Sequence, residues 1–149
     1  MPGKASLAAG EYYAHPRNLF WNIMGEQLGF SPGLCYEKRL AKLRSSGIAL
    51  WDVLQSCVRE SSLDNRIETD SEVPNDFAAF FRQHPRLTHV FFNGAKAEQC
   101  FHRHVRPLLR AKELKYLRLP STSPANAGIP YEKKRLAWQA VTRIVPGKY

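Results

Sequence analysis

The sequence predicts an α/β domain in which a short, mostly parallel sheet is covered by helices on both faces. Short apolar runs, typical of buried strands, alternate along the chain with segments whose apolar residues recur at helical spacing. Gly and Pro stand between these segments, where turns are expected. The 149 residues, 44% of them hydrophobic, suffice for one domain with its own core.

The first part of the chain predicts two helices and a strand. Helical spacing of apolar residues begins at Phe20 and again at Tyr36, and these two patterns end at Gly29 and Gly47. The short apolar run 48–54 then predicts a buried strand.

The second part of the chain repeats the alternation of helix, strand and loop. It begins with a polar, acidic surface loop at 61–72 and a helix that is capped by Pro74-Asn75-Asp76 and stops before His84-Pro85. A strand at 87–92, a turn at 93–94 and a helix at 95–105 follow. The last predicted elements are a strand at 114–119, a loop at 120–128 and a helix from Pro130 to about Ile144. Ligands of such sheets bind beyond the carboxyl ends of the strands, which here are 93–94 and 120–128.

Charge is distributed unevenly along the chain. Residues 1–81 hold 8 Lys and Arg against 10 Asp and Glu, whereas residues 82–149 hold 14 against 3. The formal net charge of +9 therefore comes from the second part of the chain. Such asymmetry indicates a polyanionic partner, with nucleic acid first and an anionic membrane surface second.

Other classes of protein are disfavoured by simple patterns. No apolar run approaches the roughly 20 residues of a membrane span, and no secretory signal pattern is present, so we expect a cytoplasmic protein. Three scattered cysteines indicate reduced thiols. His102 and His104 follow Cys100 at spacings of two, which do not share a helix face, so neither a metal nor another cofactor is expected.

The segment Tyr12–Trp21 concentrates four aromatic rings, a histidine, an arginine and an amide near the N-terminus. Pro16 biases His15 away from helical geometry, so residues 12–16 are expected to form an extended loop. Loops on an α/β scaffold commonly carry binding and catalytic groups. The alternative interpretation, that the rings only fill the core, applies more to Phe20 and Trp21 than to the two tyrosines.

Four segments of the chain, in consistent order, resemble the uracil-DNA glycosylase superfamily. Tyr13-Ala14-His15-Pro16-Arg17-Asn18-Leu19-Phe20-Trp21 is similar to a motif of its mismatch-specific branch, and the double tyrosine is closer to the hypoxanthine-DNA (deoxyinosine) glycosylase branch. Met1-Pro2-Gly3 resembles the end of the first catalytic loop, Phe91-Phe92-Asn93-Gly94 the base-reading strand, and Leu119-Pro120-Ser121-Thr122-Ser123-Pro124 the loop that presses into the DNA minor groove.

The resemblance implies a three-layer α/β/α fold and base-excision repair of DNA. It also implies a central first strand that would precede Met1, so residues 1–149 are expected to be a single glycosylase domain truncated at its N-terminus. Two positions that are polar and catalytic in other branches are Met1 and Leu119 here. This departure argues against plain uracil excision and moves the catalytic role to Asn18, which the hypoxanthine branch is thought to use.

Recognition of an extruded base can be assigned to three residues. Tyr13, with Tyr12 second, is the expected stacking platform, because stacking returns roughly 1–3 kcal/mol per base. The Asn93 amide offers a donor for O6 and an acceptor for N1–H of hypoxanthine. The alternative for Asn93 is a left-handed turn residue before Gly94.

Catalysis is assigned to Asn18, with His15 as a second candidate. An amide does not titrate, so Asn18 would orient a water and stabilise the departing base or the cationic sugar by position. The alternative is that Asn18 caps the helix that follows. His15 could protonate the leaving purine or could be a structural hydrogen-bond partner.

The expected DNA contacts lie in the last third of the chain. They are Ser121, Thr122 and Ser123, which can donate to phosphate oxygens, and Lys133 and Lys134 near the start of a helix. The expected partner is double-stranded DNA with a deaminated base, bound by a monomer close to the nucleoid.

The predicted function is therefore that of a monofunctional DNA-deoxyinosine glycosylase, which excises hypoxanthine from an extruded nucleotide. The alternative is a non-catalytic or truncated nucleic-acid-binding α/β module of the same descent. A serine hydrolase using Ser121 or Ser123 is disfavoured, because neither serine lies in a Gly-x-Ser-x-Gly motif.

Overall fold

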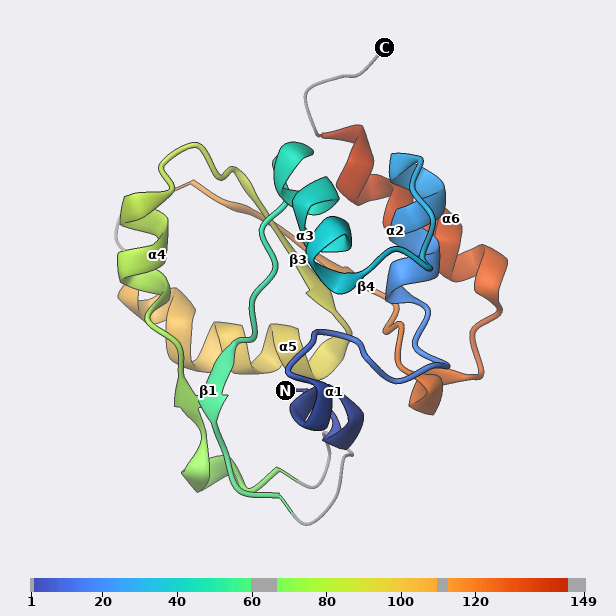
Figure 1. The fold of residues 1–149 in the computed structure, drawn as a ribbon. Helices are drawn as coiled ribbons and strands as arrows, with labels where there is room; N and C mark the ends of the chain where they lie inside the picture. Colours follow the sequence, from blue (N-terminus) through green and yellow to red (C-terminus); the bar gives the residue numbers. More distant parts are fainter. Residues whose placement is uncertain (1, 60–66, 110–112, 145–149) are drawn as a thin grey trace. The chain divides into compact units, whose positions relative to one another are not determined.

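The computed structural model describes residues 2–59, 67–109 and 113–144 (Figure 1). Contacts divide the chain into two compact units. The strand unit is the described part of residues 52–119, and the helix unit is made of residues 2–51 and 120–144.

The strand unit contains two pairs of strands. β3 (His89–Asn93) and β4 (Lys115–Leu119) pair in parallel and in register, with Asn93 opposite Leu119. β1 (Leu54–Ser56) and β2 (Val73–Pro74) form a short antiparallel pair. Figure 1 shows β3 and β4 side by side with their arrowheads at the same end. The α/β class and the parallel pair are thus confirmed.

The predicted strand at 48–54 is wrong for most of its length. Residues 48–53 have no regular secondary structure, and only Leu54 belongs to a strand. The run is short, and only Leu54 of its seven residues is buried, four others being half-buried and two exposed. An apolar run of this length does not by itself distinguish a strand from a packed connection.

Two predicted helices of the strand unit are confirmed. α4 (Phe77–Gln83) begins after Asp76, whose carboxylate accepts the backbone N–H of Ala79 at 2.9 Å. α5 (Ala95–Cys100) continues into a π-helical turn, η3 (Phe101–Val105), and then the 3₁₀ turn η4 (Arg106–Leu108). The predicted helix 95–105 is therefore continuous but changes its hydrogen-bond pattern at Phe101.

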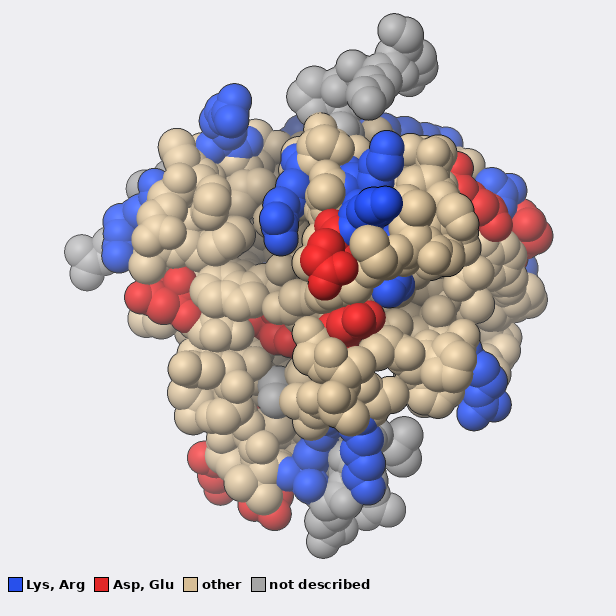
Figure 2. Space-filling view, in the orientation of Figure 1, with Lys and Arg blue, Asp and Glu red and all other residues tan. Residues whose placement is uncertain are grey.

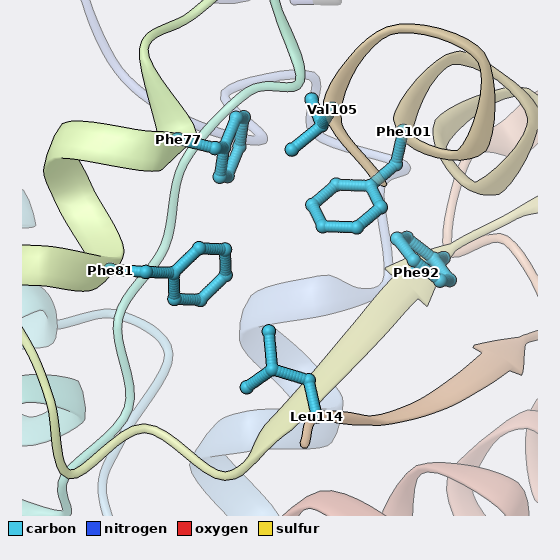
Figure 3. Packing of buried hydrophobic residues seen from close by; sticks show 6 residues of the cluster. All are labelled: Phe77, Phe81, Phe92, Phe101, Val105 and Leu114. Carbon is cyan, nitrogen blue, oxygen red and sulfur yellow. The ribbon is translucent and has the colours of Figure 1, made fainter. Parts of the chain in front are cut away.

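The core of the strand unit is dominated by phenylalanine (Figure 3). Phe77 and Phe81 of α4 point toward Phe101 of η3 and Phe92 of β3 in this view. The ring centroids of Phe77 and Phe101 lie 5.4 Å apart, and those of Phe92 and Phe101 lie 5.2 Å apart. These contacts fix α4 and η3 against β3, the strand that ends at Asn93.

A buried carboxylate joins the segment before β2 to α5 and η3. The Glu72 carboxylate accepts hydrogen bonds from Lys96 at 2.6 Å, His104 at 2.7 Å and Arg103 at 3.1 Å, and the Cys100 thiol lies 3.6 Å away. Burial alone would raise the pKa of Glu72, but the hydrogen bonds and the charge of Lys96 outweigh it and lower this pKa to about 2.

The predicted surface loop at 61–72 is therefore wrong at its last residue. Residues 61–66 lie outside the described residues, and Thr69–Ser71 form the 3₁₀ turn η2. Glu72 is buried because the cationic side chains of Lys96 and Arg103 and the imidazole of His104 converge on it.

The helix unit is built from α1 (Lys4–Ala9), α2 (Phe20–Leu28), α3 (Tyr36–Ser45), the 3₁₀ turn η5 (Pro124–Asn126) and α6 (Tyr131–Arg143). The helices predicted to begin near Phe20, Tyr36 and Pro130 are confirmed. α1 was not predicted, because it is short and carries no apolar periodicity; Gly10, at φ +65°, ends it.

α2 and α6 pack against each other within the helix unit. Gln27 of α2 donates to the carbonyl of Arg135 at 2.9 Å and accepts from the hydroxyl of Thr142 at 3.2 Å. The rings of Phe20 and Trp138 meet edge to face, with centroids 5.6 Å apart. Both ends of α2 therefore contact α6, its start through Phe20 and its end through Gln27.

Helix length and surface charge bear on whether the protein can bind a membrane or a polyanion. No described helix is both long and apolar enough to cross a membrane. On the face drawn in Figure 2, Lys and Arg side chains stand in several separate groups, with Asp and Glu between some of them.

Candidate active site

The aromatic segment Tyr12–Trp21 is held from both sides by hydrogen bonds within the helix unit. The backbone N–H of Tyr12 donates to the hydroxyl of Tyr36, and the Tyr12 carbonyl accepts the indole N–H of Trp21, both at 2.9 Å. The backbone N–H of Ala14 donates to the hydroxyl of buried Ser6 at 3.1 Å. α1, α2 and α3 thus all contribute to fixing this loop.

The expectation of an extended loop at residues 12–16 is wrong. The segment is a succession of turns, and Tyr13 adopts φ +57°, in the left-handed region. Among the described residues, Tyr13 is the only non-glycine residue with positive φ. Such a conformation carries strain for a side chain with a Cβ and persists where the surroundings enforce it, commonly at functional sites.

The conformation of Tyr13 places its ring against α2. The rings of Tyr13 and Phe20 stack with centroids 4.1 Å apart and an interplanar angle of 29°. Tyr12 lies 6.4 Å from Tyr13, centroid to centroid, and is tilted by 44°. Both tyrosines are half-buried, whereas Phe20 and Trp21 are core residues.

Asn18 lies at the start of α2 and is held on its backbone and its side chain. Its N–H donates to the His15 carbonyl at 2.8 Å, and its amide oxygen accepts the N–H of Phe20 at 3.0 Å. The capping alternative is wrong in its strict form, because the N-cap residue of α2 is Leu19 and no side chain caps it. Asn18 lies one residue earlier and instead bonds the first N–H of the helix. The same bond orients the amide, so that Nδ2 is the side-chain group available to donate to a ligand.

His15 makes one hydrogen bond that constrains its protonation. Its Nδ1 accepts the backbone N–H of Arg17 at 3.1 Å. A neutral ring with an accepting Nδ1 carries its proton on Nε2, and a doubly protonated ring would lose this bond. The geometry favours His15 as an Nε2–H donor.

Two serine hydroxyls of the loop 120–128 have the same local arrangement. Ser121 Oγ accepts the N–H of Ser123, and Ser123 Oγ accepts the N–H of Ala125, both at 3.2 Å. Within the described part of the chain, neither hydroxyl donates a hydrogen bond. Each is thus oriented by its backbone partner and has its O–H to offer.

The loop 120–128 is anchored at three carbonyl groups. The Trp138 indole donates to Pro120 at 2.9 Å, the backbone N–H of Leu19 to Thr122 at 3.0 Å, and the Lys134 ammonium to Asn126 at 2.8 Å. The middle anchor ties the loop to the residue next to Asn18. The structure therefore brings the aromatic segment and the serine loop together.

Two residues expected at a DNA-contacting surface lie in the interior instead. Thr122 is 0% exposed and Lys134 is 1% exposed. The Thr122 carbonyl accepts the N–H of Leu19, just before α2, and the Lys134 ammonium reaches back to Asn126. Lys133, one position earlier on α6, is exposed.

Asn93 lies in the strand unit, at the carboxyl end of β3. The positive φ belongs to Gly94 (+95°) and not to Asn93, so the interpretation of Asn93 as a left-handed turn residue is wrong. Gly94 donates to the carbonyls of Phe92 and Leu119 at 2.9 and 3.1 Å. Asn93 is therefore the last residue of a rigid ladder and is half-buried.

Two residues that shape the site, Ser6 and Trp138, were not identified from the sequence. A third, Lys134, was identified, but its place in the interior was not. A signal existed for two of them, since Lys134 and Trp138 are four residues apart and share a face of the final helix. No local pattern indicates that Ser6 contacts the loop, because that bond joins residues of separate turns.

Comparison with known proteins decides the family. The family profile of the uracil DNA glycosylase superfamily matches residues 1–142. The chain belongs to the uracil DNA glycosylase superfamily. A glycosylase of this superfamily acts on DNA, which agrees with the basic composition.

Two curated relatives and one solved structure are similar over most of the chain. A protein of Methanosarcina acetivorans named hypoxanthine DNA glycosylase is 35% identical over 144 residues, 96% of this chain and 86% of the relative. A protein of Methanosarcina barkeri with the same name is 35% identical over 127 residues, 85% of this chain and 76% of the relative.

The solved structure supports the fold of the superfamily. It is the solution NMR structure of a candidate uracil DNA glycosylase from Methanosarcina acetivorans, with a TM-score of 0.78 and 34% identity. The match covers 97% of this chain and 85% of that chain. The α/β fold that the resemblance implied is that of a uracil DNA glycosylase.

Proposed function

We propose that the protein is a monofunctional DNA glycosylase that removes hypoxanthine from deoxyinosine in double-stranded DNA. The observation that carries this proposal is the similarity to two proteins named hypoxanthine DNA glycosylase along most of the chain. The apolar residues Met1 and Leu119, at positions that are polar in other branches, support hypoxanthine over uracil. Residues 1–149 act as one glycosylase domain, in keeping with the family match over 1–142.

The reaction hydrolyses the bond between C1′ of the sugar and N9 of the base. Extrusion of deoxyinosine from a mispair with thymine costs a few kcal/mol, less than extrusion from a matched pair. The Tyr13 ring, set by its left-handed backbone and by Phe20, stacks on the extruded base, with Tyr12 beside it. Asn93 donates to O6 and accepts from N1–H.

Asn18 serves the chemical step. Its amide oxygen is fixed by Phe20, so its Nδ2 and its second oxygen lone pair hold the attacking water or the departing base. The C1′–N9 bond breaks first, the water oxygen bonds to C1′, and the water proton ends on hypoxanthine. His15 contributes an Nε2–H donor, in line with the bond at its Nδ1.

Phosphate contacts come from Ser121, Ser123 and Lys133. The two hydroxyls are oriented by backbone N–H groups and donate outward, and Lys133 is exposed near the start of α6. Thr122 and Lys134 support this surface from inside. The protein acts as a monomer on DNA in the cytoplasm, close to the nucleoid.

Single-turnover excision tests the proposal. The substrates are a labelled duplex with one deoxyinosine opposite thymine and a matched duplex with one uracil. We expect release of hypoxanthine and much slower release of uracil. Binding of both duplexes without release of either base would favour the alternative, a nucleic-acid-binding module of the same descent.

A further inference from the structure

Lys134 is a buried lysine of the helix unit whose charge is not balanced by an opposite charge among the described residues. Lys134 is 1% exposed, and among the described residues no carboxylate lies within ion-pair distance of it. Its ammonium donates to one neutral group, the carbonyl of Asn126, at 2.8 Å. Burial lowers the pKa of Lys134 and disfavours its charged form.

The position on α6 adds to the unfavourable environment. Lys134 is the fourth residue of a helix that starts at Tyr131, where the positive end of the helix dipole repels a cation. A methionine or leucine would fill the same space without burying a charge. Among the groups that the structure describes, the bond to the Asn126 carbonyl is therefore the one that favours the ammonium.

That bond is the first of a short chain of bonds that ends at the serine hydroxyls. The Asn126 side chain donates to the carbonyl of Ser121 at 3.1 Å, and the Asn126 backbone N–H donates to the carbonyl of Ser123 at 3.0 Å. Ser121 Oγ in turn accepts from the N–H of Ser123. The Lys134 ammonium thus holds Asn126, whose own bonds to Ser121 and Ser123 shape the loop 120–128.

A second residue of α6 holds the other end of the same loop. Trp138, four residues after Lys134 and on the same helix face, donates to the Pro120 carbonyl. Between these two anchors, the Thr122 carbonyl accepts the N–H of Leu19, next to Asn18. A shift at Asn126 would reach both the serine hydroxyls and the start of α2.

We propose that Lys134 is a positioning residue for DNA binding, which never touches DNA and instead clamps Asn126 so that Ser121 and Ser123 face phosphate oxygens. This inference rests on the proposed function for the identity of the ligand. It deepens that function by separating two adjacent lysines: Lys133 contacts the polyanion, and Lys134 shapes the loop that contacts it.

The test compares Lys134→Met with the matched variant Lys133→Met by titrating a deoxyinosine duplex at several salt concentrations. We expect Lys134→Met to weaken binding about tenfold, the order expected on loss of one charge-assisted hydrogen bond. Its salt dependence should equal that of the wild type, because no phosphate contact is lost. Lys133→Met should instead lower the slope of log K against log salt by about 0.9, the value for one phosphate contact.

Two results would overturn the proposal. One is a slope for Lys134→Met that falls as it does for Lys133→Met, which would mean direct contact with phosphate. The other is unchanged affinity of a folded Lys134→Met, judged by its thermal unfolding. The excision rate at saturating DNA should change less than the affinity does.

A second variant covers the case in which Lys134→Met does not fold. Asn126→Ala removes the side-chain bond to Ser121. It should also weaken DNA binding without changing the slope of log K against log salt. Unchanged binding by this variant would contradict the proposal that Asn126 positions the loop. When both variants fold, their combination should show less than the sum of the two effects, because they loosen the same loop. These experiments measure DNA binding and not excision. If the wild type binds DNA but does not excise hypoxanthine, that result contradicts the proposed function and not the role of Lys134 in binding.

Discussion

The amide oxygen of Asn18 accepts the backbone N–H of Phe20 at 3.0 Å, so a single side chain both bonds the first residue of α2 and carries the proposed catalytic group. The two roles are compatible because they use different atoms or lone pairs of the amide. They also predict different effects on stability and on turnover, which substitution can separate.

Replacement of Asn18 by alanine should remove both roles. Loss of the hydrogen bond to the Phe20 N–H should lower the free energy of unfolding by about 1 kcal/mol. Loss of the positioned amide should slow single-turnover excision by about a hundredfold, comparable to the loss of one transition-state hydrogen-bond donor. Thermal unfolding and single-turnover kinetics on the deoxyinosine duplex measure the two effects.

Asn18→Ser is the matched control, because serine also accepts a hydrogen bond at a helix start but lacks the amide. We expect near-normal stability of this variant together with the slow excision of Asn18→Ala. Excision that follows stability across the two variants would show that Asn18 acts only through its hydrogen bond to the start of α2.

Tyr13→Ala should slow excision about tenfold or more, because stacking of one base on an aromatic ring is worth roughly 1–3 kcal/mol. Tyr13→Phe keeps the ring and its contact with Phe20, so its rate should stay close to that of the wild type. Single-turnover rates at saturating enzyme make the comparison. Equal rates for the two variants would exclude Tyr13 as the stacking platform.

The parts of the fold that sequence predicts well are those with local determinants. α2 follows from the spacing that begins at Phe20 and from Gly29, and α4 follows from the Asp76 cap. β3 and β4 follow from the short apolar runs 87–92 and 114–119, although β3 extends one residue further, to Asn93. In each case the residues that decide the structure lie inside the element or next to it.

The parts that sequence does not predict depend on contacts between distant segments. The turns around Tyr13 are set by Tyr36, Trp21 and Ser6, and no rule for residues before proline contains that information. Lys134 looks like one more exposed lysine until the position of the Asn126 carbonyl is known. The candidate residues could thus be identified from sequence, but the interior position of Lys134 could not.

Asn93→Asp should reduce excision of hypoxanthine by about tenfold to a hundredfold, since a bidentate contact to a base is worth roughly 1–3 kcal/mol. The carboxylate loses the donor to O6 and places negative charge beside that oxygen. The pairing of β3 with β4 should be kept, because this ladder uses the backbone of Asn93. Single-turnover excision measures the rate, and thermal unfolding of the same preparation measures the stability.

Uracil presents the same pattern of acceptor and N–H donor as hypoxanthine, so residual uracil excision should fall by a similar factor. A variant that keeps the wild-type rate on deoxyinosine would contradict the assignment of Asn93 as the reader of the base.

Glu72 should make the stability of the fold depend on acid pH. Its pKa is lowered from 4.5 to about 2, so the folded state holds this proton less tightly than the unfolded state does. The stabilisation is complete above pH 4.5 and is lost as pH falls toward 2. A shift of this size corresponds to about 3 kcal/mol in the free energy of unfolding.

Denaturant unfolding of the wild type and of Glu72→Gln, measured from pH 7 down to the acid limit of folding, tests this expectation. Glutamine keeps the size of the side chain but not the charge that faces Lys96, Arg103 and His104. The difference between the two proteins should be largest at neutral pH and should shrink below pH 4.5. Glu98→Gln is the control, because the pair of Glu98 with Arg118 is partly exposed and should contribute less than about 1 kcal/mol. A constant difference across this range would mean that Glu72 stabilises the fold by packing rather than by its charge.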